Sequence, residues 1–222
     1  MAQPLIIMGT GGGVYDVLDI VRALNAVERV WDLGGFLDDK RPAGSMFLDL
    51  PVLGGLAAAA TRFGGGHSFI NVIGSDTSYR SRPDVVAATG LSHERFATLV
   101  HPAANVSPHA ALGCGAYVCH GANIGGGVTV GDHVQIGPGA IIGHDSRVDD
   151  FAVIAQGAIV CGWVHVARGA YVGAGAMIRQ RQEVGELSLV GLGAVVVHDV
   201  PARVTVVGNP ARPLAGRQPA RA

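Results

Sequence analysis

Residues 118–148 read VCHGANIGGGVTVGDHVQIGPGAIIGHDSRV, and an aliphatic side chain occupies every sixth position of this stretch. The same frame extends in both directions, from Val106 to Val196, without an insertion. The residue four places after each aliphatic one is small or β-branched, with Gln182 as the exception, and glycine often follows the aliphatic residue directly. The sixteen aliphatic positions are Val106, Leu112, Val118, Ile124, Val130, Ile136, Ile142, Val148, Ile154, Val160, Val166, Val172, Ile178, Val184, Val190 and Val196.

A period of six does not match one face of an α-helix, which repeats about every 3.6 residues. It matches a short strand followed by a tight bend, with the aliphatic side chain pointing inward. Three strands and three bends close a triangular coil of eighteen residues. Fifteen repeats then make five coils, about 24 Å tall at the usual ~4.8 Å spacing of strands. The sequence therefore predicts a parallel β-helix over residues 103–207, with a tail over 208–222.

The chain has 222 residues, a formal net charge of −1 and a single lysine, Lys40. This balance offers no basic surface for a polyanion, so nucleic acid is not an expected partner. No apolar run approaches the roughly 20 residues that a membrane helix requires. The N-terminus leads straight into an apolar strand without the features of a secretory signal. We therefore expect a cytoplasmic protein with no membrane partner.

The first hundred residues show a different pattern, in which apolar strands alternate with segments of helical periodicity. A proline close to the start of the last helical segment is typical of a first helical turn. The alternation predicts a small α/β domain with a Rossmann-like sheet over residues 1–102. The predicted strands cover residues 5–8, 30–37 and 69–73, and the predicted helices begin near Val14, Gly55 and Ser81.

A glycine-rich loop, Gly9-Thr-Gly-Gly-Gly13, follows the first predicted strand. Glycines let the backbone approach a phosphate, and the N-terminus of the next helix supplies N–H donors and a partial positive charge. A dinucleotide fingerprint requires another glycine at position 14, which is Val14, so a mononucleotide diphosphate fits better than NAD. Asp38 ends the second strand, where a contact to ribose or base is expected. A tight turn without a ligand is the alternative interpretation.

Taken together, these features resemble the hexapeptide-repeat nucleotide-sugar and sialic-acid acetyltransferases, the family typified by the bacillosamine-pathway sugar N-acetyltransferase. The resemblance is carried by the glycine-rich loop, the segments 99–102 and 106–108, the repeats, and the closing Val207-Gly-Asn-Pro-Ala211. It implies a left-handed β-helix, a homotrimer, acetyl-CoA as cosubstrate and a nucleotide-sugar site in the first domain. The family loop usually reads Gly-x-Gly-Gly-His, whereas this chain has Gly13 in place of the histidine.

His144 is the candidate catalytic residue, because it lies at a predicted bend and is followed by Asp145. One coil of eighteen residues below and above it are Gly126 and Gly162, which leave space beside the ring. An imidazole can accept a proton near neutral pH, and an adjacent carboxylate fixes its tautomer. The family resemblance assigns His144 as general base and Asp145 as its orienting acid. The Gly162 N–H is the candidate donor to the oxyanion.

The resemblance also implies binding residues. Trp163, one coil above Asp145, either stacks on a sugar or contributes to the trimer interface, and the charge-poor stretch 103–144 is where subunit contacts are expected. A monomeric solenoid is the alternative, and no metal is expected. The acetyl-CoA positions are Gly162, Ala174 and Leu192, and the substrate positions are Gly11, Gly12, Gly13, Asp38, Asp39, Gly54 and Arg80.

The expected reaction is acetyl transfer from acetyl-CoA to the amino group of a nucleotide-linked 4-amino-4,6-dideoxy sugar. O-acetylation of a sialic-acid-like sugar, acyl groups larger than acetyl and an inactive nucleotide-sugar-binding scaffold remain open alternatives. A zinc-dependent carbonic anhydrase with the same fold is disfavoured, because its metal-binding pair of histidines five residues apart has no counterpart in this chain.

Overall fold

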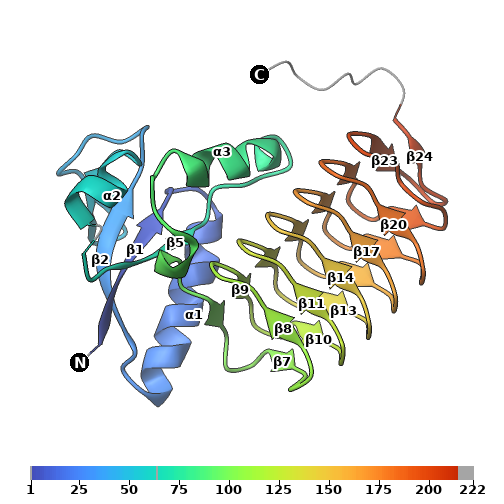
Figure 1. Ribbon diagram of the computed structural model, residues 1–222, viewed down its shortest axis with the longest axis horizontal. Coiled ribbons are helices and arrows are strands. Elements are labelled where there is room, and N and C mark those ends of the chain that lie inside the picture. Colours follow the sequence, from blue (N-terminus) through green and yellow to red (C-terminus); the bar gives the residue numbers. More distant parts are fainter. Residues whose placement is uncertain (1, 64, 215–222) are drawn as a thin grey trace. The chain divides into compact units, whose positions relative to one another are not determined.

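The computed structural model describes residues 2–63 and 65–214, and the chain divides into two compact units at Pro102 and Ala103 (Figure 1). Within the described residues, no helix has both the length and the apolar character needed to cross a bilayer. The first unit is an α/β domain, and the second is built from short strands joined by turns.

The first unit contains a five-stranded sheet in the order β3-β4-β2-β1-β5. All neighbours are parallel except β3 and β4, which form an antiparallel hairpin. The predicted Rossmann-like sheet and its first strand–loop–helix unit are confirmed. The elements are β1 (Gln3–Met8), α1 (Gly13–Val27), β2 (Trp31–Leu37), β3 (Met46–Phe47), β4 (Leu50–Gly54), α2 (Ala58–Phe63), β5 (Ser68–Asn71), η1 (Tyr79–Ser81), α3 (Arg82–Ala87), η2 (His93–Arg95) and β6 (Leu99–Val100).

One predicted boundary in this unit is wrong. The helix expected from Gly55 begins only at Ala58, and the segment before it forms β4, which pairs with β2. The Asp38 N–H donates to the Gly54 carbonyl, 2.9 Å away, at the end of this pairing. The pairing partner lies far away in sequence, so local periodicity carries no signal for it.

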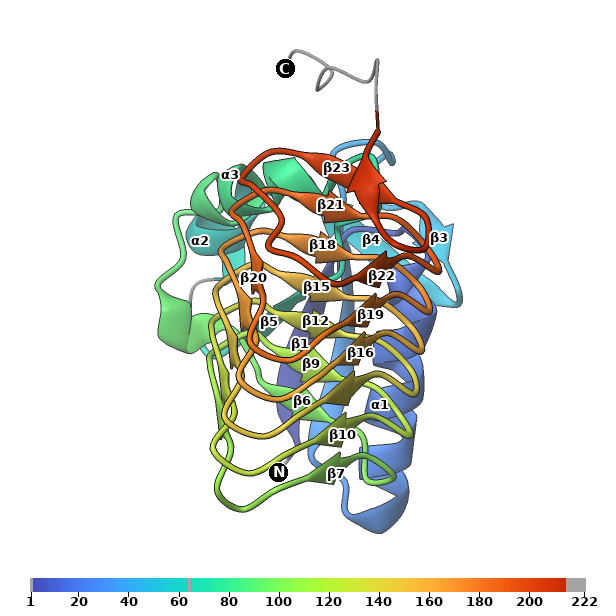
Figure 2. The same cartoon turned by 90° about the vertical axis from the view of Figure 1, so that its right-hand side faces the viewer.

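The second unit is the predicted β-helix, and each aliphatic position ends a two-residue strand (Figure 2). From β7 to β19, each strand pairs in parallel with the strand eighteen residues later, as Ile124 does with Ile142. From Val118 to Val196 these aliphatic side chains are at most 5% exposed and form the core. The strands are β7 (Asn105–Val106), β8 (Ala111–Leu112), β9 (Tyr117–Val118), β10 (Asn123–Ile124), β11 (Thr129–Val130), β12 (Gln135–Ile136), β13 (Ile141–Ile142), β14 (Arg147–Val148), β15 (Val153–Ile154), β16 (Ile159–Val160), β17 (His165–Val166), β18 (Tyr171–Val172), β19 (Met177–Ile178), β20 (Glu183–Val184), β21 (Leu189–Val190), β22 (Val195–Val196), β23 (Thr205–Val207) and β24 (Arg212–Pro213).

The turns share a backbone feature that the sequence pattern does not reveal. In fourteen consecutive turns, from Gly115 to Gly193, the third residue after the aliphatic one has a positive φ, and eight of these residues are glycine. The glycines directly after the aliphatic residues have a different role: they let the backbones of neighbouring coils lie close together. A Cβ on Gly143, for example, would lie 2.6 Å from the Gly162 nitrogen.

The last coil is shorter than the others. The eighteen-residue offset gives way to sixteen, because Leu189 pairs with Thr205. β24 then folds back against β23 in antiparallel orientation. The predicted tail therefore begins with an ordered hairpin, and its residues 215–222 lie outside the described part of the chain.

A charged network lies on the outer face of the β-helix that contains β14 and β17. Asp149 accepts hydrogen bonds from Arg147 Nε at 2.5 Å and from His165 Nε2 at 2.8 Å. Partial burial raises the pKa of Asp149, but the hydrogen bonds from His165 and Arg147 outweigh it, so the pKa lies below its usual value. The carboxylate is therefore better stabilised in the folded than in the unfolded chain.

Asp149→Asn is expected to destabilise the protein in a pH-dependent manner. A depressed folded pKa contributes stability above the unfolded pKa of about 3.9, and this contribution disappears as the pH falls through the folded value. At pH 7 the variant should lose up to about 1 kcal/mol of unfolding free energy, as is typical of partly exposed pairs. Urea unfolding at neutral and strongly acidic pH measures the difference, and an equal loss at both would contradict this assignment.

Candidate active site

The His144–Asp145 pair lies in the turn after β13 and faces solvent. The His144 Nδ1 is 2.9 Å from Asp145 Oδ2, and the two side chains are 56% and 52% exposed. Asp145 has a φ of +58°, one of the six positive values at non-glycine positions in the fourteen turns. A carboxylate can only accept, so in the neutral ring the proton is on Nδ1 and the lone pair is on Nε2. The pair has the arrangement that a general base requires.

The coil arithmetic predicts Gly126 and Gly162 on either side of the His144 ring, and the structure places only Gly162 next to it. A Cβ on Gly162 would lie 2.9 Å from His144 Nε2, whereas one on Gly126 would meet only a serine hydroxyl at 3.5 Å. Two further glycines, not singled out from the sequence, have tighter constraints. A Cβ on Gly125 would lie 2.8 Å from the backbone nitrogen of His144, and one on Gly127 would lie 2.5 Å from Asp145 Oδ1.

Trp163 also contacts the pair. Its indole meets the His144 imidazole edge-on, with ring centroids 4.4 Å apart and an interplanar angle of 82°. The guanidinium of Arg181, one coil further on, lies over the indole at 4.4 Å from the ring centroid. The sequence places Trp163 near Asp145 but carries no signal that its ring touches His144 or that Arg181 covers it.

The three predicted acetyl-CoA positions do not come together within one chain. Ala174 and Leu192 occupy the turns after β18 and β21, one coil apart at the same corner, and Leu192 is 83% exposed. Gly162 occupies the turn after β16, at the next corner. The sheet between these two corners turns apolar side chains outward, among them Ile141 at 41% and Met177 at 48% exposure.

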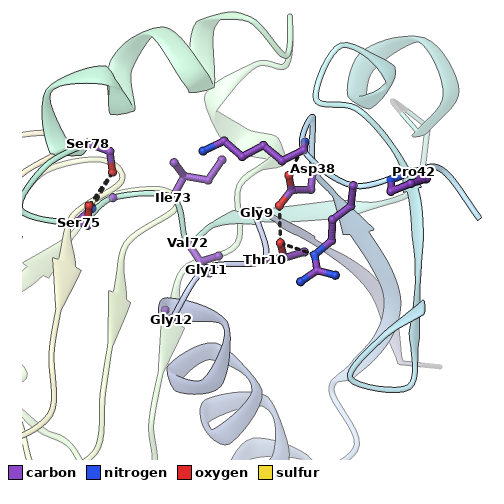
Figure 3. A pocket seen from close by; sticks show the side chains of 14 residues that line it. Gly9, Thr10, Gly11, Gly12, Asp38, Pro42, Val72, Ile73, Ser75 and Ser78 are labelled. Carbon is purple, nitrogen blue, oxygen red and sulfur yellow. Dashed lines mark hydrogen bonds between the residues drawn. The ribbon is translucent and has the colours of Figure 1, made fainter. Parts of the chain in front are cut away.

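The first unit contains a cavity of about 640 Å³ at the carboxyl ends of β1 and β2, lined by the predicted Gly11, Gly12, Gly13 and Asp38 (Figure 3). Gly11 and Gly12 have ordinary φ values, and a Cβ on either would meet nothing within 4 Å. Neither glycine is therefore required by the packing of the chain itself. Their absent side chains leave the loop backbone open to a molecule in the cavity.

Asp38 organises this cavity through its carboxylate. Its Oδ2 accepts a hydrogen bond from the Thr10 hydroxyl at 2.6 Å, and its Oδ1 accepts one from the Lys40 N–H at 2.8 Å. Arg41 Nε donates to the Thr10 hydroxyl at 2.9 Å, and its guanidinium lies 4.2 Å from the Phe47 ring centroid. Lys40 and Arg41 both line the cavity and were missed from the sequence, although they directly follow the acidic end of the second strand.

Three predicted substrate residues are not among the described residues that line the cavity. Asp39 Oδ1 accepts the Leu56 N–H at 2.8 Å and so orders the turn before α2. Gly54 ends β4, and the guanidinium of Arg80 lies over the Tyr79 ring at 5.0 Å. In the part of the chain that is described, no group of three or more His, Cys, Asp or Glu side chains could hold a metal ion.

Solved structures of sugar acetyltransferases are similar to this chain over nearly its whole length. The acetyltransferase domain of PglB from Neisseria gonorrhoeae FA1090, also solved with acetyl coenzyme A, is 30% identical, with a TM-score of 0.81 over 96% of this chain and 100% of that one. PerB from Caulobacter crescentus, in complex with CoA and GDP-perosamine, is 28% identical, with a TM-score of 0.82 over 97% and 99%.

A variant of the Caulobacter crescentus perosamine N-acetyltransferase, in which one histidine is replaced by asparagine, was also solved with CoA and GDP-perosamine. It is 27% identical to this chain, with a TM-score of 0.81 over 97% of this chain and 98% of that one. No protein-family model matches the chain, and no curated protein matches it either.

Proposed function

The chain belongs to the hexapeptide-repeat family of acetyl-CoA-dependent sugar N-acetyltransferases, and from this premise we propose that it acetylates the amino group of a nucleotide-linked 4-amino-4,6-dideoxy sugar with His144 as general base. The observation that carries the proposal is the His144 ring at an open corner, with Nδ1 held by Asp145 and Nε2 next to Gly162. The solved relatives hold CoA and GDP-perosamine, which supports an amino-sugar acceptor.

In the proposed reaction, His144 Nε2 accepts a proton from the sugar amine as the nitrogen attacks the thioester carbonyl. Asp145 stabilises the imidazolium that forms. The tetrahedral oxyanion then re-forms the carbonyl as the C–S bond breaks and the CoA thiolate leaves, and His144 returns the proton to the sulfur, so the ring ends the cycle neutral. No water molecule takes part in these reaction steps.

The Gly162 N–H is the proposed donor to the tetrahedral oxyanion. Within the described residues, the neighbouring N–H groups of Cys161 and Trp163 donate to backbone carbonyls, whereas no backbone hydrogen bond uses that of Gly162. Gly143 has no side chain to fill the space beside this nitrogen. An N–H donor fixed by the fold stabilises developing charge without having to reorganise.

The cavity of the first unit is the proposed site of the nucleotide diphosphate. The loop of Gly11 and Gly12 precedes the N-terminus of α1, where backbone N–H groups and the helix dipole favour an anion. Lys40 and Arg41 add two positive charges to the same cavity. Because Gly13 replaces the family histidine, we expect the other residues of the cavity to determine which nucleotide is bound.

A homotrimer is proposed, because residues at two different corners are required to bind one CoA. Gly162 of one copy and Ala174 and Leu192 of the next form one groove only if two β-helices lie side by side. The exposed apolar side chains on the sheet between these corners, such as Met177, provide the surface that such an interface would cover.

Met177→Glu is expected to dissociate the trimer, because it introduces a charge into an apolar interface. Light scattering during size-exclusion chromatography should give three chains for the parent protein and one for the variant, which should also lose most activity. Glu183→Lys is the control, since Glu183 is an exposed strand residue on another sheet and outside residues 103–144. A monomeric parent, or a trimeric and fully active variant, would contradict the trimer.

The proposed reaction is tested by following thiol release from acetyl-CoA with UDP-, GDP- and dTDP-linked 4-amino sugars. Release with one of these substrates, and not with its 4-hydroxy counterpart, is expected. Release with hydroxyl acceptors such as a sialic-acid-like sugar would instead indicate O-acetylation. If nucleotide sugars bind but no acceptor releases thiol, the chain is an inactive scaffold. Propionyl-CoA and longer donors test the acyl chain length.

A further inference from the structure

Trp163 has a backbone conformation that its side chain does not favour. Its φ is +56°, at a turn position that is glycine in eight of fourteen turns. A bulky residue at positive φ is strained relative to glycine, a cost that Phe151 and Leu187 also carry at the same position of other turns. The side chain is 47% exposed, so burial in the core does not account for its presence. The indole must therefore be explained by what it touches.

The contacts of Trp163 connect three successive coils at the corner of the candidate active site, because His144 lies in the coil before its own and Arg181 in the coil after it. Its ring meets the His144 imidazole at 4.4 Å, and the Arg181 guanidinium lies over the same ring at 4.4 Å. Backbone hydrogen bonds fix the spacing, since the Trp163 N–H donates to the His144 carbonyl at 3.0 Å and the Arg181 N–H donates to the Gly162 carbonyl at 3.2 Å. Arg181 has a positive φ as well, of +62°.

His144 needs a second constraint besides Asp145. Both partners of the Nδ1 hydrogen bond are more than half exposed, and exposed pairs hold their geometry weakly. A perpendicular contact with the indole restricts rotation of the imidazole about its Cβ–Cγ bond. Rotation would turn Nε2 away from Gly162, where the acceptor amine must lie for the proposed proton transfer.

We propose that Trp163 is a positioning residue, which is held in place by Arg181 and keeps Nε2 of His144 directed at the acceptor. This inference rests on the proposed function, in which His144 is the general base. It differs from stacking on a sugar, because the contact that carries it is with the His144 imidazole. It also accounts for a strained and exposed tryptophan next to the reacting group.

The test separates folding from catalysis through Trp163→Gly, because glycine is the residue that most turns have at this position. The variant should keep or raise its Tm and remain a trimer, while kcat falls by about 10- to 100-fold, the loss typical of a misplaced catalytic group. The KM values for acetyl-CoA and the nucleotide sugar should stay within about twofold, since ground-state binding is not affected. Trp163→Phe, which retains an aromatic ring, should recover most of kcat.

Leu187→Gly is the matched control, because Leu187 has the same positive φ in a turn at another corner, and this variant should retain parental activity. Arg181→Gln should lower kcat less than Trp163→Gly. The proposal would be overturned if Trp163→Gly had parental kcat, a clearly lower Tm, or a raised sugar KM with unchanged kcat. Loss of the trimer in this variant would also overturn it. If His144→Asn retains parental kcat, the proposed function itself fails, whatever Trp163 does.

Discussion

His144→Asn is expected to lower kcat by about 10²- to 10⁴-fold, the usual contribution of a general base. Asparagine is of similar size and can still donate to Asp145, but it has no basic nitrogen to accept the proton of the acceptor. The Kd values for CoA and for the nucleotide sugar should remain unchanged, because the ring acts on the reacting atoms. Stopped-time assays of thiol release, together with calorimetric titration of both substrates, measure the two effects separately.

His165→Asn is the matched control for this experiment. His165 also lies on the β-helix and also contacts a carboxylate, Asp149, but on the face that contains β14 and β17. Its replacement should change stability and leave kcat near the parental value. A His144→Asn protein that folds and turns over within about twofold of the parent would remove His144 from the mechanism.

Gly12→Asp is expected to raise the KM for the nucleotide sugar by about 100-fold or more, equivalent to roughly 2.7 kcal/mol of lost binding. Gly12 is the N-cap of α1, and a new carboxylate there would occupy the space proposed for the diphosphate. Like charges brought together at a binding site are strongly unfavourable. The KM for acetyl-CoA should not change, because the proposed acetyl-CoA site lies on the β-helix.

This substitution should not unfold the protein. A Cβ at Gly12 meets nothing within 4 Å, and the φ of −57° and ψ of −32° at this position are accessible to aspartate, so α1 should be retained. Gly12→Asn is the control that adds the same bulk without the charge, and its effect on KM should be much smaller. Equal effects of the two variants would point to crowding alone, and an unchanged KM in Gly12→Asp would exclude the diphosphate from this loop.

The β-helix was predictable because each repeat assigns one residue type to one structural position. Every sixth residue from Val118 to Val196, the aliphatic position of the repeat, is buried, and the frame ends where the regular coils end. The positive-φ position was not predictable from the pattern. Glycine occurs at two positions of the repeat for two different reasons, and six of the fourteen positive-φ residues, including Asp145 and Trp163, are not glycine.

The geometry of the candidate site was predictable where coil arithmetic applies. His144, Asp145 and Gly162 meet because eighteen residues separate successive levels of a corner. The same arithmetic separates Gly162 from Ala174, which lies twelve residues on and hence at a different corner. The ring contact between His144 and Trp163 depends on side-chain rotamers, which no sequence spacing specifies.

The first unit was less predictable, because its sheet depends on pairing between distant segments. Asp39 lies beside Asp38 in sequence, but its carboxylate orders the turn before α2 and not the cavity. Lys40 and Arg41 were overlooked because a charged pair after a strand is usually a solvated turn. The structure gives them a common cavity with the glycine-rich loop.

A crystal structure of the protein with CoA and a nucleotide-linked 4-amino sugar tests the central claim most directly. The distance from His144 Nε2 to the amino nitrogen of the sugar should fall within hydrogen-bond reach, about 2.6–3.2 Å, with the CoA sulfur beside that amine. An amine bound away from His144, or an imidazole with Nε2 turned from the sugar, would contradict the account.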